Sequence, residues 1–446
     1  MSQTYDILIR GGIVATPNGV AAADIGVIGG RIAAIGSLPN AKAAEIFEAK
    51  GLHVLPGVMD TQVHFREPGN EHKEDLDTGT RAAILGGVTT IFEMPNTSPP
   101  TTNVQAVQDK LARAKGRAHC DYAFYAGATP QNIEELKVLE ALPGVCGIKA
   151  FLGSSTGSLL LNNPDDILKA LKSGKRRVAV HSENEDRLIA RKHYAEPGKP
   201  TTHPIWRDAE AARMSTERVL RLARAAGRRL HVLHVTTGDE IPLLAAAKEF
   251  ATAETTPQHL TLSAPECYER LGTYAQMNPP IRDESHRLAL WDAVRQGVID
   301  VIGSDHAPHT REEKDKEYPG TPSGMPGVQT MATILLDHVN KGNLTLERFV
   351  DLTASGAQRI FGIAGKGRIA QGYDADFTIV DLSLTREITN SWIASRCGWT
   401  PFDGMKTKGW PVATILRGRT VMRDFAAVTA ASGEPARFLE TLVPAP

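Results

Sequence analysis

The chain has 446 residues, of which 41% are hydrophobic and 23% are charged, and its net charge at pH 7 is −1. This composition is typical of globular proteins, and the length is sufficient for a large core and two domains. The near-zero charge argues against a nucleic-acid or membrane-surface protein, and no apolar run is long enough to span a bilayer. Four widely separated cysteines form no Cys-x-x-Cys pair, and the N-terminus lacks a basic and apolar leader. We therefore expect free thiols, no signal peptide and a cytoplasmic location.

Both ends of the chain are predicted to form short strands separated by turns. Near the N-terminus the strands are predicted at 5–10, 13–16, 24–28 and 31–35, with Gly-Gly or Pro-Asn-Gly turns between them. Near the C-terminus they are predicted at 367–372, 375–381 and 412–422. Neither segment alone buries much apolar surface. We therefore predict one small β-sandwich domain built from both termini, residues 1–55 plus 365–446.

The middle of the chain alternates strands with amphipathic helices. Strands are predicted at 54–60, 88–94, 121–126, 145–152, 177–182, 229–235, 251–255 and 300–303, and helices at stretches such as 74–85, 103–114 and 208–226. Eight such repeats predict an α/β fold, a parallel (β/α)8 TIM barrel over residues 56–364. A doubly wound open sheet is the alternative. It gives no reason for reactive residues after so many strands, whereas a barrel collects its active site at the strand ends.

The first barrel strand runs directly into a set of polar residues. An apolar run at 53–59 is followed by Asp60, Gln62, His64 and Arg66. Side chains alternate between the two faces of a strand, so these four are expected on one side. An acid, an amide, an imidazole and a guanidinium together suit a metal and an anionic substrate. The alternative is an exposed, polar strand end.

Later strands end in a similar way. Lys149 lies within an apolar strand, where a lysine is costly unless it is paired or modified, although it can also reach the surface. His181 ends the fifth strand. His231 and His234 are three residues apart, so only one can face the barrel mouth. We expect His234 to do so and His231 to be structural.

Asp305 follows the eighth predicted strand and completes the set. Neutral imidazoles and carboxylates at several strand ends are the ligands of zinc or a similar divalent ion. Such an ion lowers the pKa of a bound water and polarises a carbonyl, which gives metal-assisted hydrolysis. Asp305 can then take and return a proton as a general acid–base.

Longer motifs connect these residues to a known family. They are His64-Phe-Arg-Glu-Pro-Gly69, His72-Lys-Glu-Asp-Leu-Asp-Thr-Gly79, Met94-Pro-Asn-Thr97, Gly147-Ile-Lys-Ala-Phe-Leu-Gly-Ser-Ser-Thr-Gly157, Val180-His-Ser-Glu-Asn184, Met277-Asn-Pro-Pro-Ile-Arg282, Gly303-Ser-Asp-His-Ala-Pro-His309 and Ser323-Gly-Met-Pro-Gly327. With them the chain resembles the cyclic amidohydrolases of the amidohydrolase superfamily, and within these the dihydroorotases of the longer, bacterial type. The resemblance covers nearly the whole chain, and the β segments at both ends look like the family's small sandwich domain.

The resemblance implies a ligand set and a set of substrate contacts. In that family the lysine is carboxylated and bridges two zinc ions. Carried over, Lys149 is the bridge, one zinc is held with His181 and His234, and the other with His64 and Asp305. The implied substrate contacts are Arg66, Asn96, Asn278 and His309. Arg66 makes physical sense as a bidentate clamp for an orotate-type carboxylate, and allantoinases and hydantoinases usually lack an arginine there.

One departure from the family pattern bears on the metal. The family's first strand carries His-x-His, and here the first histidine is Gln62. A carboxamide is a poor zinc ligand compared with imidazole. We therefore expect one tight zinc, at Lys149, His181 and His234, and a second that is weak or absent. Gln258 is a smaller departure, to which we attach no mechanism.

The resemblance implies a dihydroorotase, which interconverts dihydroorotate and N-carbamoyl-L-aspartate in pyrimidine biosynthesis. The alternatives are another cyclic-amide hydrolase, acting on a hydantoin, allantoin or imide, and a catalytically silent homologue that is a scaffold for aspartate transcarbamoylase. We expect a small-molecule substrate and a homo-oligomer, a dimer or tetramer. The charged segment 310–318 is expected to be a solvated loop, with a closing lid as the alternative.

Overall fold

The computed structural model describes residues 4–155 and 159–442, so the last two residues of the motif at 147–157 lie outside the described part. Its centre is a sheet of eight parallel strands that pair in sequence order. They are β6 (Val58–Val63), β7 (Val88–Glu93), β8 (Asp121–Gly127), β9 (Val145–Phe151), β10 (Val178–His181), β11 (Leu230–Val232), β12 (Ala251–Thr255) and β13 (Val301–Ile302). A parallel bridge between Val63 and His306 joins the last strand's continuation to the first. The predicted barrel is confirmed.

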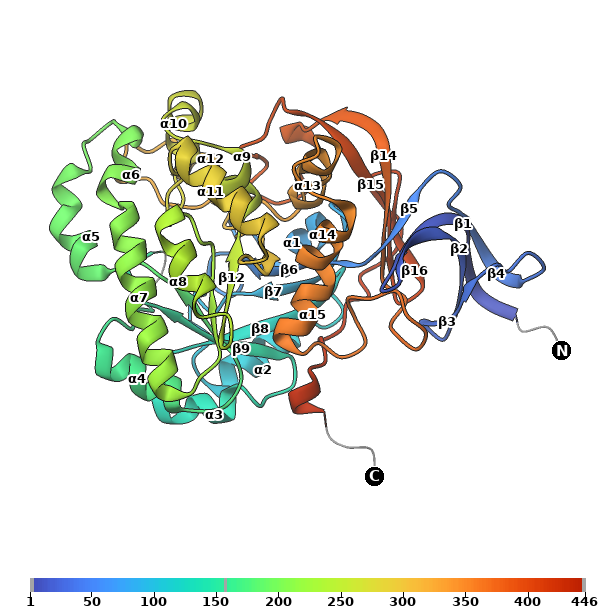
Figure 1. The fold of residues 1–446 in the computed structure, drawn as a ribbon, viewed down its shortest axis with the longest axis horizontal. Coiled ribbons are helices and arrows are strands. Elements are labelled where there is room, and N and C mark those ends of the chain that lie inside the picture. Colours follow the sequence, from blue (N-terminus) through green and yellow to red (C-terminus); the bar gives the residue numbers. More distant parts are fainter. Residues whose placement is uncertain (1–3, 156–158, 443–446) are drawn as a thin grey trace.

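Helices follow the strands and cover the outside of the barrel (Figure 1). They are α1 (Leu76–Leu85), α2 (Val104–Ala114), α3 (Leu136–Leu139), α4 (Pro164–Lys172), α5 (Glu185–Arg191), α6 (His203–Trp206), α7 (Ala209–Ala226), α8 (Ile241–Ala245), α9 (Pro257–Thr261), α10 (Glu266–Leu271), α11 (Glu284–Arg295), α12 (Arg311–Lys314), α13 (Met331–Asn340), α14 (Leu346–Val350) and α15 (Gly356–Phe361). Asn103 and Asp208 begin two of them, because each side chain accepts a hydrogen bond from a backbone N–H of the first turn. None of the described helices is long and apolar enough to cross a membrane.

Two apolar layers hold the barrel together. One lies between the strands and the surrounding helices, and the other fills the inside of the barrel. In the inner layer the ring of Phe92 lies 6.2 Å from Tyr125 and 5.1 Å from Phe361, centroid to centroid. Because these aromatic rings fill the inside of the barrel, the polar side chains at the strand ends have space only at the carboxyl end of the barrel.

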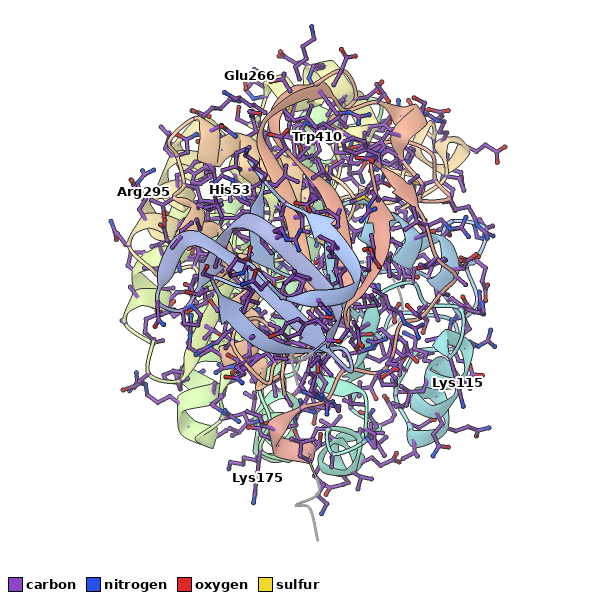
Figure 2. All side chains as sticks on the ribbon, turned by 90° about the vertical axis from the view of Figure 1, so that its right-hand side faces the viewer. His53, Lys115, Lys175, Glu266, Arg295 and Trp410 are labelled. Carbon is purple, nitrogen blue, oxygen red and sulfur yellow. The ribbon has the colours of Figure 1, made fainter. Side chains whose placement is uncertain are left out.

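Both chain termini contribute to a second, nine-stranded sheet. Its strands are β1 (Thr4–Thr16), β2 (Gly19–Ile28), β3 (Arg31–Gly36), β4 (Lys42–Glu48), β5 (His53–Pro56), β14 (Phe377–Glu387), β15 (Lys406–Leu416), β16 (Arg419–Arg423) and β17 (Ala426–Ala427). The antiparallel pairing of β5 with β14 joins the two halves. Figure 2 shows the blue N-terminal strands and the orange-red C-terminal strands on one face of the molecule. The domain limits at 55/56 and 364/365 stay a prediction.

Three predicted elements differ from the structure. The strand expected at 54–60 is divided at Gly57 between the two sheets, where a Cβ atom would lie 2.3 Å from the Thr89 hydroxyl. The Gly-Gly turn expected at 11–12 is a register shift inside the continuous strand β1. Residues 367–372 form no strand. In each case glycine permits a local change of direction, and the neighbouring chain decides which one occurs.

Candidate active site

The polar residues at the carboxyl ends of the barrel strands surround one pocket. The open space inside it and at its mouth together is about 340 Å³. It is lined by Gln62, His64, Arg66, Asn96, Lys149, Phe151, Ser155, His181, His234, Asn278, Asp305, Ala307, Ser323 and Gly324. All five predicted metal ligands and three of the four predicted substrate contacts are therefore together, although the chain separates them by up to 241 residues.

Three of the pocket residues have a left-handed backbone. The φ angles are +66° at Arg66, +35° at His234 and +46° at Asp305. This region costs energy for residues other than glycine, and such residues cluster at functional sites. Each of the three lies two or three residues beyond the end of a barrel strand, so the backbone turns where the side chain enters the pocket. Period-two alternation does not predict this, because it applies only within the strand.

Two histidines form one half of the pocket. The Nδ1 atom of His181 lies 3.1 Å from Nε2 of His234, and the rings are nearly perpendicular, with centroids 4.8 Å apart. Two imidazole nitrogens that share a tetrahedral zinc at ordinary bond lengths lie about 3.3 Å apart. Burial lowers the pKa of both histidines, which favours the neutral form that binds metal.

The orientation of His181 is fixed from behind by Glu183. Nε2 of His181 donates to Oε2 of Glu183 at 2.8 Å, so the Nδ1 lone pair of the neutral ring faces His234. Arg207 is paired with the same carboxylate, with Nε 3.1 Å from Oε1. Burial by itself would raise the pKa of Glu183, but Arg207 and His181 lower it well below its ordinary value. Glu183 therefore selects the tautomer of a candidate ligand.

The other half of the pocket is built around Asp305. Its Oδ1 lies 3.2 Å from Nε2 of His64 and accepts a hydrogen bond of 2.9 Å from the amide nitrogen of Gln62. Nδ1 of His64 lies 2.6 Å from Oδ1 of Asn96, which accepts its proton in the neutral ring. The lone pair on Nε2 then faces a carboxylate, an arrangement that a cation between them relieves. Asn96, predicted as a substrate contact, thus orients a predicted ligand.

Lys149 lies between these two pairs in the barrel wall. Its Nζ is buried, has no hydrogen-bond partner among the described residues, and lies 4.6 Å from the centroid of Phe151. Burial lowers the pKa of Lys149 to about 7, so a substantial fraction is neutral near neutral pH. Only a neutral amine can react with carbon dioxide to give a carbamate. An unpartnered buried amine is therefore consistent with a modified lysine.

The donor set fits a metal only with a contribution from this lysine. Within residues 4–155 and 159–442, no group of three His, Cys, Asp or Glu side chains is arranged to hold an ion by itself. The pocket instead offers two pairs, His181 with His234 and His64 with Asp305. Oε1 of Gln62 and Nδ1 of His234 are further buried atoms without partners in the described part. A carboxylated Lys149 would supply each pair with its missing oxygen ligand.

The predicted substrate contacts differ in position. Arg66 lines the pocket, and its Nε donates to the carbonyl of Pro308 at 3.2 Å. Asn278 also lines it, with Oδ1 held by Nε2 of His203 at 3.0 Å. His309 is fully buried behind the wall. Because its Nδ1 accepts from Lys73 at 3.2 Å, its Nε2 is the donor and bonds the Ser323 carbonyl at 3.1 Å.

Most of the charged segment 310–318 is exposed, as its composition suggests, but the segment is partly helical and anchored at Glu313 and Lys314. It contains helix α12, which begins with a capping box formed by Thr310 and Glu313. Lys314 is fully buried, and its Nζ donates to three backbone carbonyls. Glu313 pairs with Lys73 at 2.9 Å. The expected solvated segment is thus present at its exposed residues, whereas Lys314 is buried because the loops at 276–278 and 321–324 surround it.

A second, larger hollow adjoins the pocket and shares Ser155, Asn278 and Ser323 with it. Its empty space is about 1020 Å³, and its walls include Leu188, Trp206 and Pro322. Because the two hollows have wall residues in common, they lie side by side, and the larger one is called the outer hollow. No pattern in the sequence predicts this outer hollow.

Sequence reasoning also missed two residues that support the site. Glu183 stands two residues after His181, and the His-Ser-Glu spacing places both on the same side of an extended chain, a signal that was available. Lys314 had no such signal, because a lysine within a charged run is normally exposed.

Comparisons with known proteins agree with this geometry. The Amidohydrolase family matches residues 53–421. A dihydroorotase from Halobacterium salinarum is 38% identical over 423 residues, which cover 93% of this chain and 96% of that protein. An allantoinase from Rubrobacter xylanophilus is 37% identical over 453 residues and covers 98% of both chains. An L-hydantoinase structure from Arthrobacter aurescens superposes with a TM-score of 0.92 at 29% identity, covering 97% of this chain and 99% of that one.

The predicted family resemblance is thereby confirmed. The family match covers most of the chain, and the two sequence relatives each cover more than nine-tenths of it. Relatives named dihydroorotase and allantoinase are similar to almost the same extent, so similarity alone does not select the ring that is opened. The chain belongs to the amidohydrolase family and is a hydrolase that acts on cyclic amides.

Proposed function

We propose that the protein is a dihydroorotase, which reversibly hydrolyses (S)-dihydroorotate to N-carbamoyl-L-aspartate in pyrimidine biosynthesis. The observation that carries the proposal is Arg66. Its guanidinium is buried in the pocket wall, and among the described residues it forms no salt bridge with a carboxylate. Burial lowers the pKa of Arg66 to about 10, which leaves it charged at neutral pH. A buried charge of this kind calls for an anionic partner, and the ring carboxylate of dihydroorotate supplies one.

The chain's own residues divide the work between binding and proton transfer. Arg66 binds the carboxylate, with Asn96 and Asn278 as further polar groups against the ring. Asp305, which lies next to His64, takes a proton from the attacking water and returns it to the leaving ring nitrogen.

The metal belongs to the same proposal. Members of the amidohydrolase family are generally metal-dependent, most commonly with zinc. A carboxylated Lys149, with His181 and His234, would hold the tight zinc, and His64 and Asp305 would hold a second, weaker one. When bound, zinc lowers the pKa of water and polarises the scissile carbonyl. A homo-oligomer and an association with aspartate transcarbamoylase stay predictions.

The direct test is hydrolysis of L-dihydroorotate, followed by absorbance, with zinc-loaded protein and a chelator-treated sample as control. We expect turnover that the chelator abolishes and that zinc restores. A folded, zinc-loaded protein without turnover would contradict the proposal and would favour first the other cyclic amides, then a silent homologue.

The role of Arg66 gives a sharper test. Arg66→Met removes the charge and keeps an unbranched stem, so the KM for dihydroorotate should rise about 100-fold, the loss expected for a buried charge-assisted pair. For 5,6-dihydrouracil, the same ring without the carboxylate, the KM should change little. Arg311→Met, on the exposed start of α12, is the matched control. An equal rise with both rings would remove the clamp from the proposal.

Hydrolysis of a substituted hydantoin or allantoin is the second candidate, and the outer hollow favours it. Leu188, Ile189 and Trp206 give that hollow an apolar wall which dihydroorotate, a small and polar ring, does not need. A panel of ring substrates distinguishes the two candidates. Preference for a ring with an apolar substituent over dihydroorotate would favour the second.

A further inference from the structure

Lys314 is a buried lysine that the proposed chemistry does not use, and burial lowers its pKa to about 7. The side chain is 0% exposed, and Nζ donates to the carbonyls of Gln276, Pro322 and Gly324 at 3.2, 3.0 and 3.2 Å. No salt bridge to a carboxylate is present for it within the described ranges. A protonated lysine has three N–H donors, so the three carbonyls match its full donor capacity. Such charge-assisted hydrogen bonds are about twice as strong as neutral ones.

The three carbonyls belong to two loops that are also bonded to each other. The N–H of Gly324 donates to the Gln276 carbonyl at 2.9 Å, and the side-chain amide of Gln276 donates to the Thr321 carbonyl and the Ser323 hydroxyl, both at 3.0 Å. Lys314 lies where these bonds meet. It therefore joins the loop at 276–278 to the loop at 321–324 through backbone atoms of both.

These two loops form one side of the substrate pocket. Asn278 is two residues beyond Gln276, and Ser323 and Gly324 lie within the second loop; all three line the pocket. The same loops also separate the pocket from the outer hollow. Neither loop contains a candidate metal ligand, since these come from the ends of β6, β9, β10, β11 and β13. What Lys314 holds is thus the binding wall and not the reacting centre.

Helix α12 connects the hydrogen bonds around Lys314 to Arg66, the proposed carboxylate clamp. The helix is only four residues long, begins two residues after His309, and is held by the bond from the Thr273 hydroxyl to the Lys314 carbonyl at 2.6 Å. His309 bonds the Ser323 carbonyl, and its Nε2 lies 3.3 Å from Nη2 of Arg66. The position of Lys314 therefore affects the pocket on both sides of the bound substrate ring, at the two loops and at Arg66.

We propose that Lys314 is a positioning residue whose ammonium group holds the loops at 276–278 and 321–324 in the arrangement that binds the cyclic-amide substrate. Loss of the charge loosens the binding wall while the groups that carry out the reaction stay in place. Removing interactions that the ground state and the transition state share raises KM and leaves kcat unchanged. The inference rests on the proposed function only in that this pocket binds the ring.

The test compares Lys314→Met, which keeps the length of the side chain without charge, with Lys316→Met, an exposed lysine on the same segment. Both are assayed with whichever cyclic amide the wild type hydrolyses best, so failure of dihydroorotate as a substrate does not affect the result. We expect Lys314→Met to raise KM about tenfold with kcat within about twofold, and Lys316→Met to change neither.

Lys314→Gln, which keeps two N–H donors, should show an intermediate rise in KM and so a graded dependence on the donors. Circular dichroism and thermal unfolding establish that each variant is folded. An unchanged KM in folded Lys314→Met, or a fall confined to kcat, would overturn the proposal. Failure of both Lys314 variants to fold would overturn it as well, because the lysine would then act in stability and not in positioning.

Discussion

Gln62 is a single residue that we expect to decide how tightly the His64 and Asp305 half of the pocket binds a metal. Its amide nitrogen donates to Oδ1 of Asp305, a candidate ligand, while its oxygen has no partner among the described residues. In this orientation the amide competes for a carboxylate oxygen that a cation would use, in addition to being a weaker ligand than imidazole. By contrast, the pair of His181 and His234 is braced by Glu183 and has no such competitor. The two halves of the pocket are therefore expected to differ in affinity.

Gln62→His should restore the second metal. After loading with zinc and dialysis, we expect about one equivalent in the wild type and about two in Gln62→His, measured by elemental analysis. Gln258→His, at a buried position that does not line the pocket, is the matched control and should retain one. Two equivalents in the dialysed wild type would show that the amide is no obstacle.

At the scale of elements, short segments after the strands carry most of the site. The left-handed residues Arg66, His234 and Asp305 lie just beyond three strands, and the four-residue helix α12 holds the wall beside them. A helix this short is not stable by itself, so its end groups and tertiary contacts must fix it. Its capping box and the pair of Glu313 with Lys73 serve this purpose.

Thr310→Ala removes the side-chain cap of α12 and should cost about 1 kcal/mol of unfolding free energy, measured with urea. Because α12 carries Lys314, the KM should also rise. Thr345→Ala removes the equivalent cap of α14, from which no pocket residue comes, and should cost a similar amount of stability without changing KM. Equal KM values in the two variants would separate α12 from substrate binding.

At the scale of the whole molecule, the positions of the elements depend on the two sheets and on the contacts that join them. Lys366, beyond the barrel helices, pairs with Asp121 at the start of β8 and with Asp376 just before β14, so one buried ammonium joins the barrel to the second sheet.

Burial within this large molecule also keeps many histidines neutral. The lowered pKa values are about 3 for His203, His231 and His309 and about 4 for His259 and His338, with burial as the largest cause.

Stability should therefore fall as the pH drops below about 6.5. There the unfolded chain binds protons that the folded histidines do not take up until pH 4 or 3, so each histidine costs about 1.4 kcal/mol per pH unit in this window. The measurement is the urea midpoint between pH 7.5 and 4.5. His338→Gln, far from the pocket, should flatten the slope relative to the wild type, while His193→Gln, at an exposed position, should not. Identical slopes for His338→Gln and wild type would contradict this account.

Much of the architecture follows from the sequence alone. Apolar strands alternating with amphipathic helices specify a parallel barrel, and a barrel necessarily brings residues such as His64, His181 and Asp305 to one end. The capping residues Asn103 and Asp208 could be placed for the same reason, since a helix start depends on neighbouring residues.

The tertiary structure decided the rest, because those features depend on partners that are distant in sequence. The amide of Gln62 is oriented by Asp305, 243 residues away. Arg207 is 24 residues from the Glu183 that it pairs with, and Lys314 is buried because two separate loops turn their carbonyls toward it. A local pattern gives the position of a side chain along the chain. The energy of burying its charge, which determines what the side chain does, is set by the groups packed around it.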